Sequence, residues 1–152
     1  MKILKVYALF FAAIFATFTV SADEKSAPSY ITSEAAKAAN LPFSEAVRVG
    51  NTLYLSGQIG AIPSTRKLAE GGIKAETQQT MENIKGVLAR QNLTMDNIFK
   101  CTVMLADISE WASFNEVYVP FFKKHFPARS AFAASGLAMN SRVEVECMAH
   151  IP

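Results

Sequence analysis

Two charged residues near the C-terminal end of the chain have the types and the setting that recognition of a carboxylic acid would use. Arg129 follows Phe126-Pro127-Ala128, and Glu144 lies fifteen positions later in a stretch that alternates apolar and polar residues. A guanidinium is a planar fork that can hold a carboxylate through two parallel hydrogen bonds, a geometry that lysine does not copy. The pair could form a ligand site, or it could belong to an ordinary strand pair with solvated charges.

The residues around both charges predict strands that would fix their directions. Pro127 disfavours helix at Phe126 and so ends the aromatic helix before it, which puts Arg129 at the entry to a strand. Residues 143–151 alternate in polarity, so that successive side chains would point to opposite faces. The expected apolar face consists of Val143, Val145, Cys147, Ala149 and Ile151, and the other face of Glu144, Glu146, Met148 and His150.

Three further residues stand at points that a ligand could reach. Asn115 lies four residues after Trp111 and three before Tyr118, so it falls on the apolar side of its predicted helix. A buried amide must find partners or cost about 1–3 kcal/mol, so Asn115 either bonds to a neighbouring loop or contacts a ligand. Ser56 and Gly57 end a predicted strand, where glycine lets the backbone approach a ligand closely.

The pattern along the chain predicts an α+β domain. We expect an edge strand at 30–32, a loop or helical turn at 33–40, a hairpin of 46–49 and 52–56 turning at Gly50-Asn51, and a loop at 57–72. A helix over 73–92, a strand over 98–105 and a second helix from an N-cap at Ser109 to about His125 follow. This order favours a mostly antiparallel sheet with two helices packed on one face.

Residues 1–22 have the features of a secretory signal peptide. Lys2 and Lys5 precede an uncharged apolar run at 6–20, and small residues at 20–22 offer a cleavage site before Asp23. The run is short for a membrane span, which needs about 20 apolar residues, although an uncleaved anchor is the alternative. We expect a periplasmic or secreted protein without stable membrane association, with a flexible leader at 23–29 and one domain at 30–152.

Charge and cysteine content limit the partners. Loss of residues 1–22 would remove two of the 15 Lys and Arg and none of the 13 Asp and Glu, which leaves 13 of each and no net charge. Nucleic-acid binding rests on a cationic footprint, so nucleic acid is not an expected partner.

Cys101 and Cys147 fall inside predicted strands. We expect buried free thiols, with a disulfide as the alternative after export, and their spacing suggests no metal site.

The C-terminal motif resembles the signature of the Rid (RidA/YjgF) family of reactive intermediate deaminases. Three blocks carry this resemblance, and their order and spacing match the family over roughly residues 30–151. They are FPARS at 126–130 with VEVE at 143–146, LSGQI at 55–59, and FNEVY at 114–118 ahead of Phe121-Phe122. The resemblance implies a chorismate-mutase-like fold and a homotrimer with sheets inside, helices outside and three clefts at the subunit interfaces.

The resemblance also implies an activity. A deaminase of this family hydrolyses 2-aminoacrylate-like 2-enamino and 2-imino acids to 2-keto acids and ammonia, and it needs no cofactor. Arg129 would hold the substrate carboxylate, and Glu144 would orient water or relay a proton. A ribonuclease role, reported for some relatives, fits poorly with a neutral mature chain.

Other positions of the implied cleft agree with the family only in part. The resemblance places Ser56, Gly57 and Asn115 at the cleft, together with Phe43 and Ala131. Phe43 stands where the deaminases typically carry a tyrosine whose hydroxyl reaches the site, and Ala131 stands where a cysteine is common. The missing hydroxyl keeps a second function open: a binding protein for small carboxylates that uses the same cleft without turnover.

The distance between the two charged residues predicts that the site is shared between subunits. If the strands that follow Arg129 and precede Ile151 pair as a hairpin turning near Met139-Asn140, Arg129 and Glu144 are offset by roughly six residues, or about 20 Å. A small imino acid cannot span that distance. Either a bulge or bend interrupts the ladder, or a second subunit supplies one of the groups, and the trimer of the family favours the second subunit.

Overall fold

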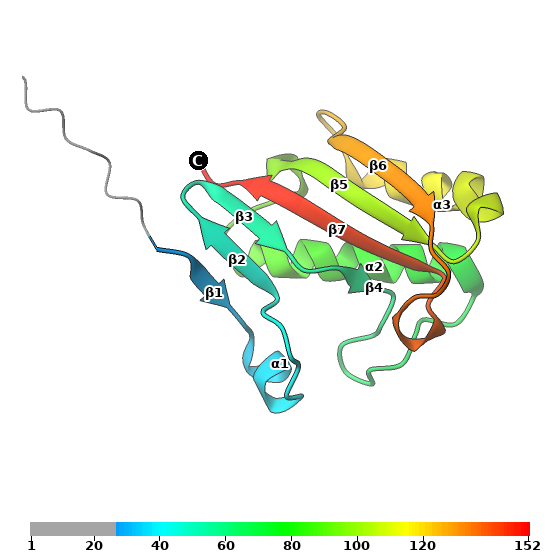
Figure 1. Cartoon of the computed structure of the whole chain (residues 1–152). Helices are drawn as coiled ribbons and strands as arrows, with labels where there is room; N and C mark the ends of the chain where they lie inside the picture. The colour runs from blue at the N-terminus through cyan, green and yellow to red at the C-terminus, as the bar shows by residue number, and fades with distance from the viewer. Residues whose placement is uncertain (1–26) are drawn as a thin grey trace, which may run out of the picture.

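A seven-stranded sheet carries both segments that hold the charged residues, as Figure 1 shows. The computed structural model describes residues 27–152. Among the described strands every pairing is antiparallel except that of β5 with β6, and the spatial order is β1-β2-β3-β7-β5-β6, with β4 also paired to β7. The strands are β1 (Ser29–Ile31), β2 (Ala46–Val49), β3 (Thr52–Leu55), β4 (Gln58–Ile59), β5 (Ile98–Leu105), β6 (Ala128–Ala133) and β7 (Val143–His150).

Two helices, α2 (Gly72–Ala89) and α3 (Trp111–Tyr118), cover one face of this sheet (Figure 1). The core lies between the layers: Leu53, Val103 and Val145 from the strands meet side chains such as Met81, Ile84 and Phe114 from the helices. The expected α+β class, with helices on one face of a mostly antiparallel sheet, is confirmed. None of the helices within residues 27–152 is long and apolar enough to cross a membrane.

Short elements complete the fold at its loops. Ser33 caps α1 (Glu34–Ala38) by accepting a hydrogen bond from Ala36 N, which makes a helix of the segment expected as a loop or helical turn. The remaining turns are 3₁₀ helices: η1 (Met95–Asn97), η2 (Ile108–Glu110), η3 (Val119–Phe121) and η4 (Ala138–Asn140). The predicted signal peptide at 1–22 and most of the predicted leader lie outside the described residues.

The second long helix is shorter than expected at both ends. Asp107, not Ser109, caps the turn before it, because the Asp107 side chain accepts a hydrogen bond from Ser109 N at 2.8 Å. At the other end α3 stops at Tyr118 and the chain continues as η3, which contains Pro120. Proline has no backbone N–H to extend the α-helical ladder, so the helix does not reach His125.

The hairpin of β2 and β3 is confirmed with its expected turn. Val49 pairs with Thr52, and Gly50 has a φ of 56°, the left-handed conformation that glycine adopts without steric cost. The expected loop at 57–72 contains one more short strand, β4, which pairs Ile59 with Glu144 of β7.

The proposed hairpin between the last two strands is wrong. β6 and β7 are not neighbours, because β5 lies between them and pairs parallel to β6 and antiparallel to β7. Arg129 is in register with Cys101, which is in register with Cys147. From this row, Glu144 lies three residues further along β7, so the Cα atoms of Arg129 and Glu144 are about 14 Å apart by the usual strand spacing and rise.

The two cysteines are bonded to each other, so the expectation of buried free thiols is wrong. Cys101 of β5 and Cys147 of β7 are cross-strand partners with a Cα–Cα distance of 4.1 Å, and both are buried. Sequence position did not reveal this pairing, because it depends on two strands separated by 46 residues becoming neighbours. Closing a loop of this length stabilises a folded chain by roughly 3–4 kcal/mol in the chain-entropy model.

Candidate functional site

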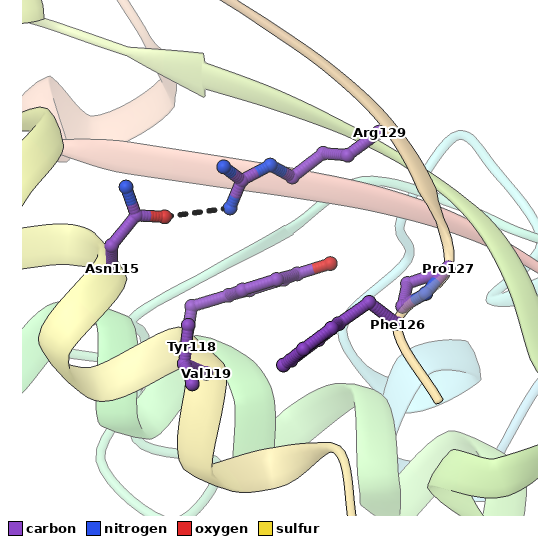
Figure 2. A pocket seen from close by; sticks show the side chains of 6 residues that line it. All are labelled: Asn115, Tyr118, Val119, Phe126, Pro127 and Arg129. Atoms are coloured by element: carbon purple, nitrogen blue, oxygen red, sulfur yellow. Dashed lines mark hydrogen bonds between the residues drawn. The ribbon is translucent and has the colours of Figure 1, made fainter. Parts of the chain in front are cut away.

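A pocket of about 440 Å³ lies where the start of β6 faces the C-terminal part of α3 (Figure 2). Its walls are mostly apolar, and Arg129 brings the one charged group among its lining residues. The lining residues are Asn115, Tyr118, Val119, Phe126, Pro127 and Arg129. The pocket thus combines mostly apolar walls with a guanidinium, which is the composition expected of a site for a small organic acid.

The Arg129 side chain has one hydrogen bond within the described residues. Its Nη1 donates to Oδ1 of Asn115 at 2.7 Å. A guanidinium has five N–H donors, so most of them are left for a ligand or water. Asn115 makes this bond to a strand residue and not to a neighbouring loop, and its amide oxygen brings two of the expected site residues together. Contact of Asn115 with a ligand stays a prediction.

Three aromatic rings of α3 surround the guanidinium. The Cζ atom of Arg129 lies 4.9 Å from the ring centre of Trp111, 5.8 Å from that of Phe114 and 4.8 Å from that of Tyr118. These distances fall within the range of cation–π contact. The sequence predicted Trp111 and Tyr118 only as part of the apolar side of a helix. The spacing of Asn115 from both residues was the signal that all three share one face.

Tyr118 is the most enclosed polar group of the pocket. Only 2% of its surface is exposed, and its hydroxyl has no hydrogen-bond partner among the described residues. Burial raises the pKa of Tyr118 to about 12, and the nearby positive charge of Arg129 opposes that shift. The phenol is therefore neutral over the whole physiological range.

Two further expected site residues, Glu144 and Gly57, lie against each other and form a second group. A Cβ atom placed on Gly57 would collide with the Glu144 carboxylate, so glycine at this position makes room for that side chain. Ser56 Oγ donates to the carbonyl oxygen of Ser44 at 2.6 Å, which ties the end of β3 to the loop that carries Phe43. The Phe43 ring is 49% exposed.

The two groups lie on opposite faces of the sheet. Arg129 and Ala131 are in register with Cys101 and Val103, which are buried on the helix-covered face. Glu144 is in register with Met104, on the face that the helices leave open. Residues paired across neighbouring strands point to the same side, so Arg129 and Glu144 of one chain point away from each other.

Within residues 27–152 the structure contains no group of three or more His, Cys, Asp and Glu side chains that could hold a metal ion. The two groups of expected site residues themselves offer hydrogen bonds and proton transfer: a guanidinium for a carboxylate in one group, and a carboxylate beside a glycine in the other.

Comparison with known proteins shows the same family from sequence and from structure. The family model described as endoribonuclease L-PSP matches residues 32–151. Human 2-iminobutanoate/2-iminopropanoate deaminase is 42% identical over 108 residues, which cover 71% of this chain and 79% of the human protein.

Solved structures agree with this match. The Rid family protein YyfA from Yersinia pestis, a protein of unknown function, superimposes with a TM-score of 0.77 and 36% identity, over 82% of this chain and all of that one. TdcF from E. coli, solved with bound serine, gives a TM-score of 0.69 with 29% identity, over 74% of this chain and 90% of that one.

We predict that Gly57→Ala moves the Glu144 side chain out of its present position. The new methyl group would overlap the carboxylate, and the Glu144 side chain can rotate away from it at little cost to the fold because the overlapping atoms are its flexible end. A crystal structure of the variant measures the displacement, and thermal unfolding measures its cost. Gly136→Ala is the matched control, because a Cβ there meets no atom within 4 Å. A Gly57→Ala protein with the stability of Gly136→Ala and an unmoved Glu144 would contradict the prediction.

Proposed function

Because this chain belongs to the Rid family, whose family model is described as endoribonuclease L-PSP, we propose that it is an imine deaminase. Its substrates are 2-aminoacrylate-like 2-enamino acids and the 2-imino acids that they form, and its products are 2-keto acids and ammonia. The observation that carries this proposal is the Arg129 pocket: a guanidinium with one internal hydrogen bond faces an apolar space of about 440 Å³.

Recognition rests on the carboxylate that every 2-imino acid carries. Arg129 holds this group through two parallel charge-assisted hydrogen bonds, while Asn115 keeps the guanidinium turned toward the pocket. The apolar rings of α3 beside it lower the local polarity, which strengthens the ion pair relative to one at an open surface. The carboxylate is thereby fixed, and the C=N carbon beside it has a defined position.

Hydrolysis then consumes one water molecule. Water adds to the imine carbon, the nitrogen gains a proton, and the C–N bond breaks to release ammonia and leave a carbonyl oxygen from the water. Glu144 is the group proposed to orient the water and relay its proton. Glycine at position 57 makes room for this carboxylate, because any side chain there would overlap it.

A homotrimer completes the site, because one chain points Arg129 and Glu144 to opposite faces. The helix-free face of the sheet also exposes large apolar side chains, with Tyr54 at 44% and Phe132 at 49%. Such a face favours packing against further copies of the chain. In this arrangement Arg129 and Asn115 of one subunit meet Glu144 and Gly57 of the next.

An alternative function is the binding of small carboxylates without turnover. Phe43 favours it, because phenylalanine lacks the hydroxyl of the tyrosine typical at this position. The hydrogen bond between Arg129 and Asn115 would serve either function. Glu144, with Gly57 making room for its carboxylate, favours the enzyme. The ribonuclease named in the description of the family model is less favoured, because the chain without residues 1–22 has no excess of cationic residues.

Export is part of the proposal. The apolar run at 6–20 follows two lysines, and the Cys101–Cys147 disulfide suits an oxidising compartment such as the periplasm or the outside of the cell. Because the usual source of such imines, pyridoxal-phosphate dehydratases, is cytoplasmic, an exported amino-acid oxidase that releases imino acids is a fitting supplier.

We predict that Arg129→Ala lowers kcat/KM for imine hydrolysis by roughly 100-fold or more, the effect of losing about 3 kcal/mol of carboxylate binding. Arg129→Lys should recover little, since an ammonium cannot form the two parallel bonds. Phe43→Tyr should leave activity unchanged or raise it. The assay follows imino acids freshly generated by an amino-acid oxidase. A wild-type protein that binds keto acids but gives no acceleration over buffer would support the binding function instead.

Subunit exchange tests the shared site. Arg129→Ala and Glu144→Ala proteins should each be inactive, and a mixture that has exchanged subunits should recover part of the activity, because some clefts then combine the intact Arg129 of one chain with the intact Glu144 of another. Light scattering should show a trimer. A fully active monomer, or a mixture without recovery after proven exchange, would rule out the shared site.

The mass of the exported protein tests the localisation. The mature chain should begin at or near Asp23 and be two hydrogens lighter than its reduced form, because Cys101 and Cys147 are joined. Mass spectrometry of the soluble extracytoplasmic fraction, before and after reduction and alkylation, measures both. Recovery of the full-length chain from the membrane fraction would contradict export, and two alkylated thiols without prior reduction would contradict the disulfide.

A further inference from the structure

Within residues 27–152, the hydrogen bond and the cation–π contacts of the Arg129 side chain all come from one face of α3. Trp111, Phe114, Asn115 and Tyr118 follow the spacing i, i+3, i+4 and i+7, which aligns them in a single stripe of the helix. Such a stripe ordinarily packs against apolar core. Here three of its rings lie 4.8–5.8 Å from Cζ of Arg129, and its amide bonds to Nη1.

This arrangement fixes the arginine before a ligand arrives. A free arginine side chain has about 2 kcal/mol of rotamer entropy, which a ligand would otherwise have to overcome on binding. Contact of a guanidinium with an aromatic face is worth about 0.5–2 kcal/mol, more when water is excluded. The stripe of α3 can thus supply much of the preorganisation that a two-bond clasp on a carboxylate requires.

Within this stripe Tyr118 acts through its ring. Its ring centre is the nearest of the three to Cζ of Arg129, and Figure 2 shows the ring between the guanidinium and Phe126. The hydroxyl is buried without a partner, so it neither bonds to Arg129 nor reaches solvent. A polar group in that situation costs the fold about 1–3 kcal/mol, and the ring below the guanidinium is the part of the residue that the site uses.

We propose that Tyr118 is a positioning residue for carboxylate recognition: its ring, with that of Trp111, holds the Arg129 guanidinium in the orientation that receives the substrate. This proposal rests on the proposed function only in its choice of ligand, since it concerns binding of the carboxylate and not the hydrolysis that follows.

The test compares 2-oxobutanoate with its uncharged amide, 2-oxobutanamide, by calorimetric titration. The ratio of the two affinities measures carboxylate recognition and is insensitive to a general loss of stability. Tyr118→Leu should reduce this ratio about 10-fold, in line with a loss of about 1.4 kcal/mol. Tyr118→Phe keeps the ring and should retain the wild-type ratio with equal or greater thermal stability. Trp111→Leu, at a partly exposed position that is safer for folding, should reduce the ratio about 3-fold.

Phe122→Leu is the matched control. Phe122 stacks on Tyr118 with a centroid distance of 4.8 Å and is buried, but it has no cation–π contact with Arg129. It should lose stability and keep the affinity ratio. If Phe122→Leu and Tyr118→Leu change the ratio equally, or if Tyr118→Leu leaves it unchanged, the positioning role is overturned. A Tyr118→Phe protein that loses the ratio would overturn the assignment to the ring.

A second measurement needs no ligand. In wild type and Tyr118→Phe, the NMR signals of the Arg129 side-chain protons should show the chemical-shift displacement that nearby rings cause. In Tyr118→Leu and Trp111→Leu, part of this displacement should vanish.

The binding and activity measurements together distinguish the positioning role from the deaminase proposal. A wild type that binds 2-oxobutanoate selectively without hydrolysing imines removes the deaminase and leaves the positioning role standing. A wild type without preference for the carboxylate overturns the positioning role.

Discussion

The parallel pairing of β6 with β5 decides what Arg129 can do. It puts Arg129 in register with Cys101, on the face of the sheet that α3 covers. The guanidinium therefore lies under the side of α3 that carries the aromatic rings. A one-residue shift in this register would turn the side chain to the open face and leave Asn115 without its partner. The disulfide joins β5 to β7 in the same row of the sheet, and thereby fixes the strand against which Arg129 is aligned.

Local patterns predicted most of the elements and the fold class. Alternation placed Glu144 on the face opposite to Val143 and Val145, and the turn at Gly50-Asn51 set the register of β2 with β3. The motif blocks identified the family, and with it the layer of helices on one side of the sheet. These features depend on neighbours in sequence or on a shared signature, so a single chain is enough to read them.

The errors came from contacts between distant segments. The last two strands were expected to pair because they follow one another, but β5 lies between them, which also made the calculated offset of Arg129 from Glu144 wrong. For the same reason, the Cys101–Cys147 bond was expected only as the alternative to free thiols. The contacts of Trp111 and Tyr118 with Arg129 were not predicted. An aromatic stripe has the same sequence pattern whether the helix packs against leucines or against a guanidinium, and only the tertiary structure distinguishes the two cases.

In the proposed function, the division of the site between two faces would separate recognition from hydrolysis. The carboxylate would be held by groups that one chain assembles on its own, since Asn115, Tyr118 and Arg129 all meet beneath α3. Movement of water and protons would depend on Glu144 and on the loop that carries Phe43, both away from that pocket. A change such as phenylalanine for tyrosine at position 43 therefore acts on turnover without disturbing the clasp on the carboxylate. The same fold can accordingly shift between an enzyme and a binding protein through residues that never touch Arg129 within one chain.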